Sequence, residues 1–134
     1  MWNKRSAGKY GAIRVKDGDR SFGSKLERTV YDILLLRQKA GEIMDIKCQP
    51  HVTLEPLSWR CVPDYSFVWA DTGKLSYCEA KGVEVDRWLA TKALWHHFGP
   101  APMEVWVGNW KKPFLKEIIV PNRSIIIEWA AKQQ

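Results

Sequence analysis

The stretch CVPDYSFVWADTGKLSYCEAKG, residues 61–82, decides the fold, because it predicts two β-strands joined by a polar turn at ADTG. Side chains alternate between the two faces of a strand, so Glu79 and Lys81 should project to the same side, about 7 Å apart. Asp64, in the first strand, should point away from the face that carries the aromatic residues of that strand. The stretch therefore places two carboxylates and an ammonium on a sheet whose other residues are largely apolar.

This pattern predicts a metal site if the strands pair so that Asp64 lies near Glu79. Two carboxylates at that range repel each other unless a cation lies between them. Oxygen ligands without His or Cys suit Mg²⁺. Lys81 would then hold a phosphate oxygen or a water beside the metal, an arrangement typical of phosphodiester hydrolysis. The alternative is ordinary cross-strand charge pairing on an exposed sheet face.

The rest of the chain predicts a single α/β domain. Apolar spacing predicts a helix over residues 24–41, with Ser24 as its cap and Gly41 at its end, and a second helix over residues 85–99. Extended structure is expected over residues 42–56 and 103–110, in addition to the two strands above. Residues 116–129 favour either a hairpin that turns at Pro121-Asn122 or a short helix capped by Ser124. The order is helix, strand, strand, strand, helix, strand.

Length and composition agree with one domain over residues 1–134, since 46% hydrophobic content can build one core in a chain of 134 residues. Neither a signal peptide nor an apolar run of membrane-spanning length is seen, so we expect a soluble, intracellular protein with no membrane partner. The three cysteines form no Cys-x-x-Cys pair and are expected to be buried free thiols.

Positive charge is concentrated at the N-terminus. Residues 1–28 hold eight Lys or Arg against three acidic residues, which accounts for +5 of the net charge of +6. We expect residues 1–20 to form a basic arm that contacts nucleic-acid phosphate, and the alternative is a solvated tail. The candidate phosphate contacts in this region include Lys4, Arg5, Lys9, Arg14 and Lys25.

Glu27, in the first turn of the first helix, is a third candidate acid. From a helix beside the sheet it could reach the same metal or a water on it. Ser24-Lys25-Leu26-Glu27 is also a capping box, in which the glutamate bonds back to the start of the helix. Both roles stay open, and they are compatible.

Further candidates for DNA contact lie later in the chain. Lys92, one turn after Trp88, would face the site from the second helix, unless it lies on a solvated face. Aromatic residues beside basic ones in expected loops suit base stacking and phosphate contact. These are Trp59 with Arg60, and Trp110 with Lys111 and Lys112.

The spread of Glu27, Pro63-Asp64 and Glu79-Ala80-Lys81 over helix, strand and strand, followed by a helix and a strand, resembles the PD-(D/E)XK nuclease superfamily. More narrowly, the chain is similar to a family of small phage-encoded, endonuclease-like proteins. This similarity lies in KYGA at 9–12, FGSKLERTVYDILLLRQKAGEI at 22–43 and QPHVTL at 49–54. The resemblance runs from about Lys9 to Trp106, and the ADTG turn makes the gap between the two acidic motifs longer than in compact members.

The resemblance implies a restriction-endonuclease-like core, a mixed sheet flanked by helices. It implies Asp64, Glu79 and the Ala80 carbonyl as ligands of Mg²⁺, which Mn²⁺ could replace. It also implies Lys81 as the catalytic lysine and Glu27 as an auxiliary acid.

The implied function is a metal-dependent DNA endonuclease in the cytoplasm of a bacterial host, such as a phage Holliday-junction resolvase or another structure-selective nuclease. One site cuts one strand, so a double-strand or junction cut would need a symmetric homodimer. Two alternatives stay open. One is a non-catalytic DNA-binding protein, and the other is a virion or packaging component that uses the fold as a scaffold.

Overall fold

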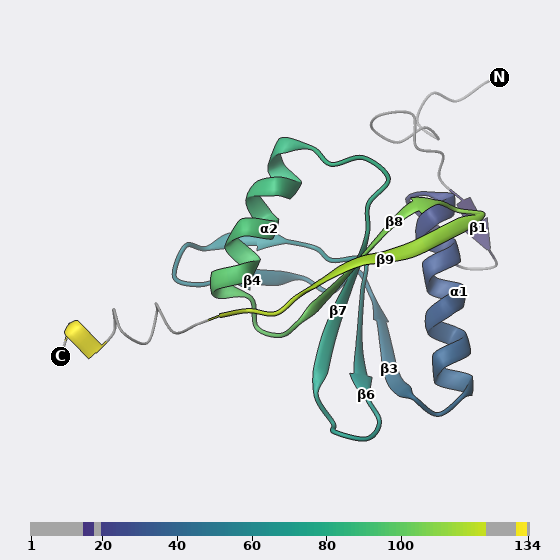
Figure 1. The fold of residues 1–134 in the computed structure, drawn as a ribbon, viewed down its shortest axis with the longest axis horizontal. Coiled ribbons are helices and arrows are strands. Elements are labelled where there is room, and N and C mark those ends of the chain that lie inside the picture. Colours follow the sequence, from purple (N-terminus) through teal and green to yellow (C-terminus); the bar gives the residue numbers. More distant parts are fainter. Residues whose placement is uncertain (1–14, 18–19, 123–130, 134) are drawn as a thin grey trace.

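A mixed sheet of five strands forms the centre of the molecule, with a helix packed on each face (Figure 1). The computed structural model describes residues 15–17, 20–122 and 131–133. The sheet has the strand order β3-β6-β7-β8-β9, where the strands are β3 Ile43–Cys48, β6 Tyr65–Trp69, β7 Leu75–Ala80, β8 Met103–Asn109 and β9 Lys112–Ile119. Neighbouring strands are antiparallel except β7 and β8, which are parallel and joined through α2. The predicted α/β class, with helices flanking a mixed sheet, is confirmed.

Both helices begin and end close to the predicted residues. Helix α1, Lys25–Lys39, starts after Ser24, whose Oγ accepts a hydrogen bond from the Glu27 N–H at 3.1 Å. It ends before Gly41, which has the positive φ of 77° that glycine adopts readily. Helix α2, Asp86–Phe98, is capped at its end by Gly99.

Alternation along β7 separates two apolar cores. Cys78 and Ala80 pack on the α1 side of the sheet, together with Leu26, Val30, Tyr31, Leu34, Tyr65 and Phe67. Tyr77 packs on the α2 side, together with Trp88, Trp95, Met103, Val105 and Ile119. Glu79 follows Cys78 in the alternation, so it belongs to the α2 side.

A partly buried ion pair ties α1 to the sheet. Arg37 Nη1 lies 3.0 Å from each carboxylate oxygen of Glu104 on β8, and Trp106 Nε1 donates to the same carboxylate at 3.0 Å. The Arg37 guanidinium also lies over the rings of Trp69 and Trp106. Arg37 thus lies on the side of α1 that faces the sheet.

The region between β3 and β6 differs from the prediction. The extended segment breaks at Gln49, which has a positive φ of 51° and is followed by Pro50, a residue without an N–H for pairing. A separate hairpin follows, made of β4, Val52–Leu54, and β5, Trp59–Cys61. The expectation that Trp59 and Arg60 lie in a loop is therefore wrong.

The last hairpin of the sheet joins β8 and β9. Strands β8 and β9 pair up to Asn109 and Lys112, so the turn residues of this hairpin, which the sequence did not predict, are Trp110 and Lys111. The Asn109 side chain decides this position, because its Oδ1 accepts hydrogen bonds from the N–H groups of Lys111 and Lys112, at 2.9 and 3.0 Å. The hairpin expected to turn at Pro121-Asn122 and the alternative helix capped by Ser124 both depend on residues 123–130, which lie outside the described residues.

Part of the expected basic arm is folded: β1, Val15–Asp17, pairs with β2, Arg20–Phe22. Lys4, Arg5, Lys9 and Arg14 lie outside the described residues. Of the three free cysteines, Cys78 is buried and Cys61 half-buried, whereas Cys48 is exposed, contrary to expectation. No helix in the described part of the chain has the length and apolar character to cross a membrane.

Candidate active site

Asp64 is held through both its backbone and its side chain. Its carbonyl accepts a hydrogen bond from Gln49 N at 2.8 Å, and its Oδ2 accepts one from Ala80 N at 2.7 Å. β6 and β7 are paired only up to Tyr65 and Cys78. The Ala80 N–H lies beyond this pairing, and the Asp64 carboxylate provides its acceptor. Asp64 thus lies directly before β6, one residue outside the strand to which the sequence assigned it.

Glu79 comes from the middle of the sheet. It is the second-last residue of β7 and lies opposite Val105 of the parallel strand β8. Asp64 and Glu79 are only 9% and 7% exposed, and their carboxyl groups hydrogen-bond each other. The predicted convergence of the two carboxylates is therefore present in the structure.

The pKa of both carboxyl groups is raised. Burial raises the pKa of Asp64 well above its ordinary value of 3.8, and the charges of Glu79 and Glu27 raise it further, against the hydrogen bond from Ala80 N. Burial also raises the pKa of Glu79, although the Lys81 ammonium opposes this. Without a cation, the pair therefore favours one shared proton over two negative charges.

Lys81 completes the group at the end of β7. Its N–H donates to the Trp106 carbonyl at 2.8 Å, which fixes its backbone on β8. Its Nζ lies 3.4 Å from Glu79 Oε1 and 5.3 Å from the centre of the Trp88 ring. The side chain is 30% exposed, so the ammonium can contact a ligand while it neutralises Glu79.

Glu27 has the capping role that the sequence suggested. Its Oε2 accepts a hydrogen bond from Gly23 N at 2.8 Å, one residue before the Ser24 cap. Its carbonyl accepts one from the Tyr65 hydroxyl at 2.8 Å, which joins the start of α1 to β6. Because its charge raises the pKa of both Asp64 and Glu79, the carboxylate also lies within electrostatic reach of the pair.

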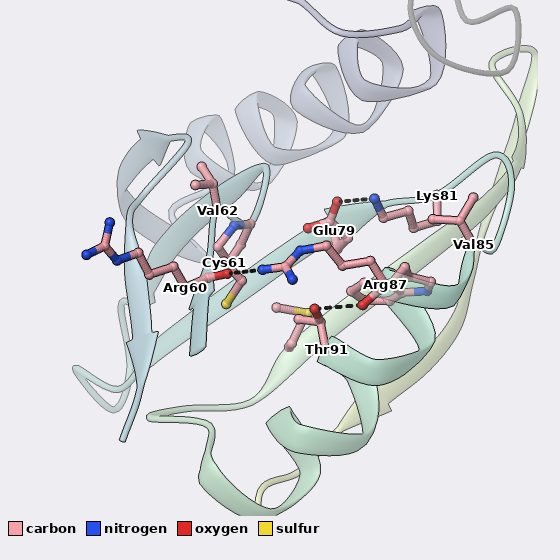
Figure 2. Close-up of a pocket in the computed structure, with 11 residues that line it drawn as sticks. Arg60, Cys61, Val62, Glu79, Lys81, Val85, Arg87 and Thr91 are labelled. Carbon is pink, nitrogen blue, oxygen red and sulfur yellow. Dashed lines mark hydrogen bonds and ion pairs between the residues drawn. The ribbon is translucent and has the colours of Figure 1, made fainter. Parts of the chain in front are cut away.

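A cleft of about 260 Å³ opens on the α2 side of the pair (Figure 2). Its lining includes Glu79, Lys81, Arg87, Trp88 and Thr91. Cys61 also lines it, and burial followed by the charge of Glu79 raises the pKa of that thiol to about 11. The thiol therefore stays protonated near neutral pH, which makes it a poor nucleophile.

Arg87 is the cleft residue that sequence reasoning missed. Its guanidinium lies over the Trp59 ring, 4.3 Å from the ring centre, and donates to the Arg60 carbonyl at 2.9 Å. These contacts hold a planar cation in the same cleft as Lys81, and Figure 2 shows it beneath the Glu79–Lys81 pair. Its position in the first turn of the helix after β7 was the available signal, but the helical pattern does not show which side of that turn meets the sheet.

The other predicted DNA contacts fall into different places. Lys92 is turned away from the cleft, because its Nζ pairs with Glu117 of β9 at 2.6 Å. Trp59 packs against α2 and donates to Thr91 Oγ1 at 3.0 Å, so it is no free stacking surface. Arg60 presents its carbonyl to the cleft and its guanidinium away from it (Figure 2). Lys25, Trp110, Lys111 and Lys112 lie at the start of α1 and the β8–β9 turn.

The residues present fit a hard divalent cation in part. Two carboxylates in contact, with raised pKa values, offer the oxygen donors that Mg²⁺ prefers. Within residues 23–122, no group of three or more His, Cys, Asp or Glu side chains is arranged to hold a metal ion. The Ala80 carbonyl, at the end of β7, is a candidate further ligand beside Asp64 and Glu79.

Comparisons with known proteins give no relative. No family model matches the chain, and no match was found among curated proteins or among solved structures.

Proposed function

We propose that the protein is a Mg²⁺-dependent DNA endonuclease of the PD-(D/E)XK type. The observation that carries this proposal is the buried contact between the Asp64 and Glu79 carboxyl groups, next to the Lys81 ammonium at an open cleft. Burying two carboxylates in contact is unfavourable for folding, because desolvation and repulsion both oppose their ionisation. Such a pair is therefore more readily explained by ligand binding than by stability.

The order of elements supports the same type of nuclease. The resemblance implies helix, three strands, helix and strand, and the chain has α1, β3, β6, β7, α2 and β8 in this order. The β4–β5 hairpin is inserted before β6, and β9 adds an edge strand to the sheet.

In the proposed reaction, a water oxygen attacks phosphorus and one P–O ester bond breaks. Asp64, Glu79 and the Ala80 carbonyl would hold Mg²⁺, which when bound supplies charge that polarises the phosphate and lowers the pKa of water. The Lys81 ammonium, beside Glu79, orients the attacking water and stabilises the charge that develops on phosphate oxygens. Arg87, held on Trp59, donates to a phosphate oxygen in the same cleft.

The test is incubation of the purified protein with labelled linear, nicked and four-way-junction DNA, in Mg²⁺ and in EDTA. We expect cleavage in Mg²⁺ and none in EDTA, and the preferred DNA will identify the substrate. Binding without cleavage of any of them in Mg²⁺ or Mn²⁺ would contradict the proposal and favour a DNA-binding protein. Neither binding nor cleavage would favour a scaffold role.

A further inference from the structure

The β8–β9 turn presents a tryptophan on a fixed backbone. Asn109 closes the turn through two hydrogen bonds to its backbone, and Thr29 Oγ1 of α1 donates to the Trp110 carbonyl at 3.0 Å. Figure 1 shows the turn beside the start of α1. The position of Trp110 is therefore set by both the hairpin and the helix.

Its indole is open to solvent, unlike the tryptophans of the core. Trp110 is 44% exposed, whereas Trp88, Trp95 and Trp106 are 8% exposed or less. A hollow of about 410 Å³ adjoins the ring, lined by Lys25, Arg28, Thr29, Asp32 and Trp110. An exposed indole next to a hollow offers a flat apolar surface to a ligand.

The surroundings of this indole are basic. Lys25 Nζ and Lys111 Nζ lie 5.1 and 5.4 Å from the centre of the Trp110 ring, and Lys112 follows in the chain. Asp32 is the one acidic residue in the lining of the hollow among the described residues. A flat ring surrounded by ammonium groups suits a ligand that carries both planar rings and negative charge, as a nucleic-acid strand does.

The turn lies at the end of the sheet where the candidate active site is found. Trp106 is paired with Ala80, and Trp110 follows four residues later, which is about 13 Å along β8. Lys25 lies two residues before Glu27 on α1. A strand held at the active site could therefore reach Trp110 within a few nucleotides.

We propose that Trp110 stacks on an unpaired base of the DNA substrate while Lys25 and Lys111 bind adjacent phosphates, so that the protein selects DNA with a single-stranded end or branch. This inference rests on the proposed nuclease function. Inside a duplex both faces of each base are covered by its neighbours, so only a single-stranded end, a branch or a single strand offers an unpaired base to the indole. If instead the two ammonium groups only cover the ring, Trp110 has no role in binding.

The test is a binding titration in EDTA, which keeps the DNA intact, with fluorescently labelled single-stranded, forked and blunt duplex DNA. We expect Trp110→Ala to weaken binding of single-stranded and forked DNA about 5- to 100-fold and to leave blunt duplex binding unchanged. Trp110→Phe is the matched control and should keep most of the affinity, because it retains an aromatic ring. Lys111→Ala should weaken binding of all three and lower the salt slope by about 0.7 to 0.9.

Equal loss on blunt duplex and forked DNA, or no loss with Trp110→Ala, would overturn the stacking site. Stronger Trp110-dependent binding of RNA of the same sequence would overturn DNA as the ligand. These results are separable from the nuclease proposal. Cleavage without a selective effect of Trp110→Ala refutes only the stacking site, whereas a selective effect without metal-dependent cleavage refutes only the nuclease.

Discussion

Asp64 and Glu79 show how strand alternation predicts a site. Alternation along β7 indicated that Glu79 and Lys81 share a face, and the structure brings Asp64 onto Glu79 as expected. Arg87 could not be found in this way, because its position depends on packing against Trp59 from a distant hairpin. Single residues are thus predictable where local geometry orients them, and not where a tertiary contact does.

The raised pKa of Asp64 gives a prediction about stability. Folding raises the pKa of Asp64 above 3.8. The folded state therefore loses stability as pH rises from 3.8 toward the pKa of Asp64 in the folded protein, and this loss persists at higher pH. Asp64→Asn can keep the bond from Ala80 N and donate to Glu79, but it cannot ionise. In EDTA at about pH 8 we expect the variant to be more stable than the wild type by roughly 1–2 kcal/mol, a Tm increase of a few degrees.

Thermal unfolding followed by circular dichroism, over a series of pH values, measures this difference. It should shrink as pH falls toward 3.8 and disappear below about 3, where wild-type Asp64 is protonated in both states. If the wild type is instead more stable than Asp64→Asn at high pH in EDTA, burial of the carboxylate pair does not destabilise the folded state.

Lys81 should affect turnover more than metal binding, because an ammonium is no metal ligand. Lys81→Met keeps an unbranched side chain and removes the ammonium that lies beside Glu79 and over the Trp88 ring. We expect kcat to fall roughly 10²- to 10³-fold, with the Mg²⁺ concentration for half-maximal activity changed much less. A titration of activity against Mg²⁺ measures both, and a parallel loss of metal affinity would mean that Lys81 assembles the site.

At the scale of elements, both helices and the β6–β7 hairpin were predictable, whereas the β8–β9 turn and the break after β3 were not. Ser24 and Gly41 bound α1 through contacts within one turn of the chain, so a local pattern is sufficient. The β8–β9 turn depends on one side chain, Asn109, that caps two N–H groups. The break after β3 depends on the positive φ of Gln49, a conformation that the type of residue alone does not predict.

Glu27 can be tested as part of α1. Glu27→Gln can still accept from Gly23 N but has no charge near the carboxylate pair. We expect stability to change by less than about 0.5 kcal/mol and cleavage to fall about 10- to 100-fold, as for groups that support metal ligands. Ser24→Ala is the control for the helix cap and should lower stability by about 1 kcal/mol. Full cleavage by Glu27→Gln would leave Glu27 with the capping role alone.

For the whole molecule, class and element order followed from the sequence, but the full extent of the sheet did not. The five-stranded sheet includes β9, an edge strand with exposed apolar residues such as Phe114 and Ile118, which lack the clean alternation that marks a strand with one buried face. The α1–sheet arrangement depends on the Arg37–Glu104 pair, whose partners are far apart in the chain.

The basic arm is a whole-molecule property, because it acts through charge. Residues 1–14 contain Lys4, Arg5, Lys9 and Arg14 and no acidic residue, and their removal leaves β1 in place. If the arm binds phosphate, the truncated protein should bind DNA more weakly, with a salt slope lower by up to about 3.6. Cleavage at saturating DNA should persist. Binding isotherms at several salt concentrations decide this, and parallel plots would mean that the arm is only solvated.

The most direct test of the site is DNA cleavage in Mg²⁺ by Asp64→Asn and Glu79→Gln, compared with the wild type at matched DNA occupancy. Both variants keep the size and hydrogen-bonding capacity of the side chain, so we expect them to fold and to bind DNA. Cleavage should fall at least about 10³-fold in each, because the ligand pair is broken. Cleavage by either variant at the wild-type rate would contradict the assignment of Asp64 and Glu79 as the catalytic pair.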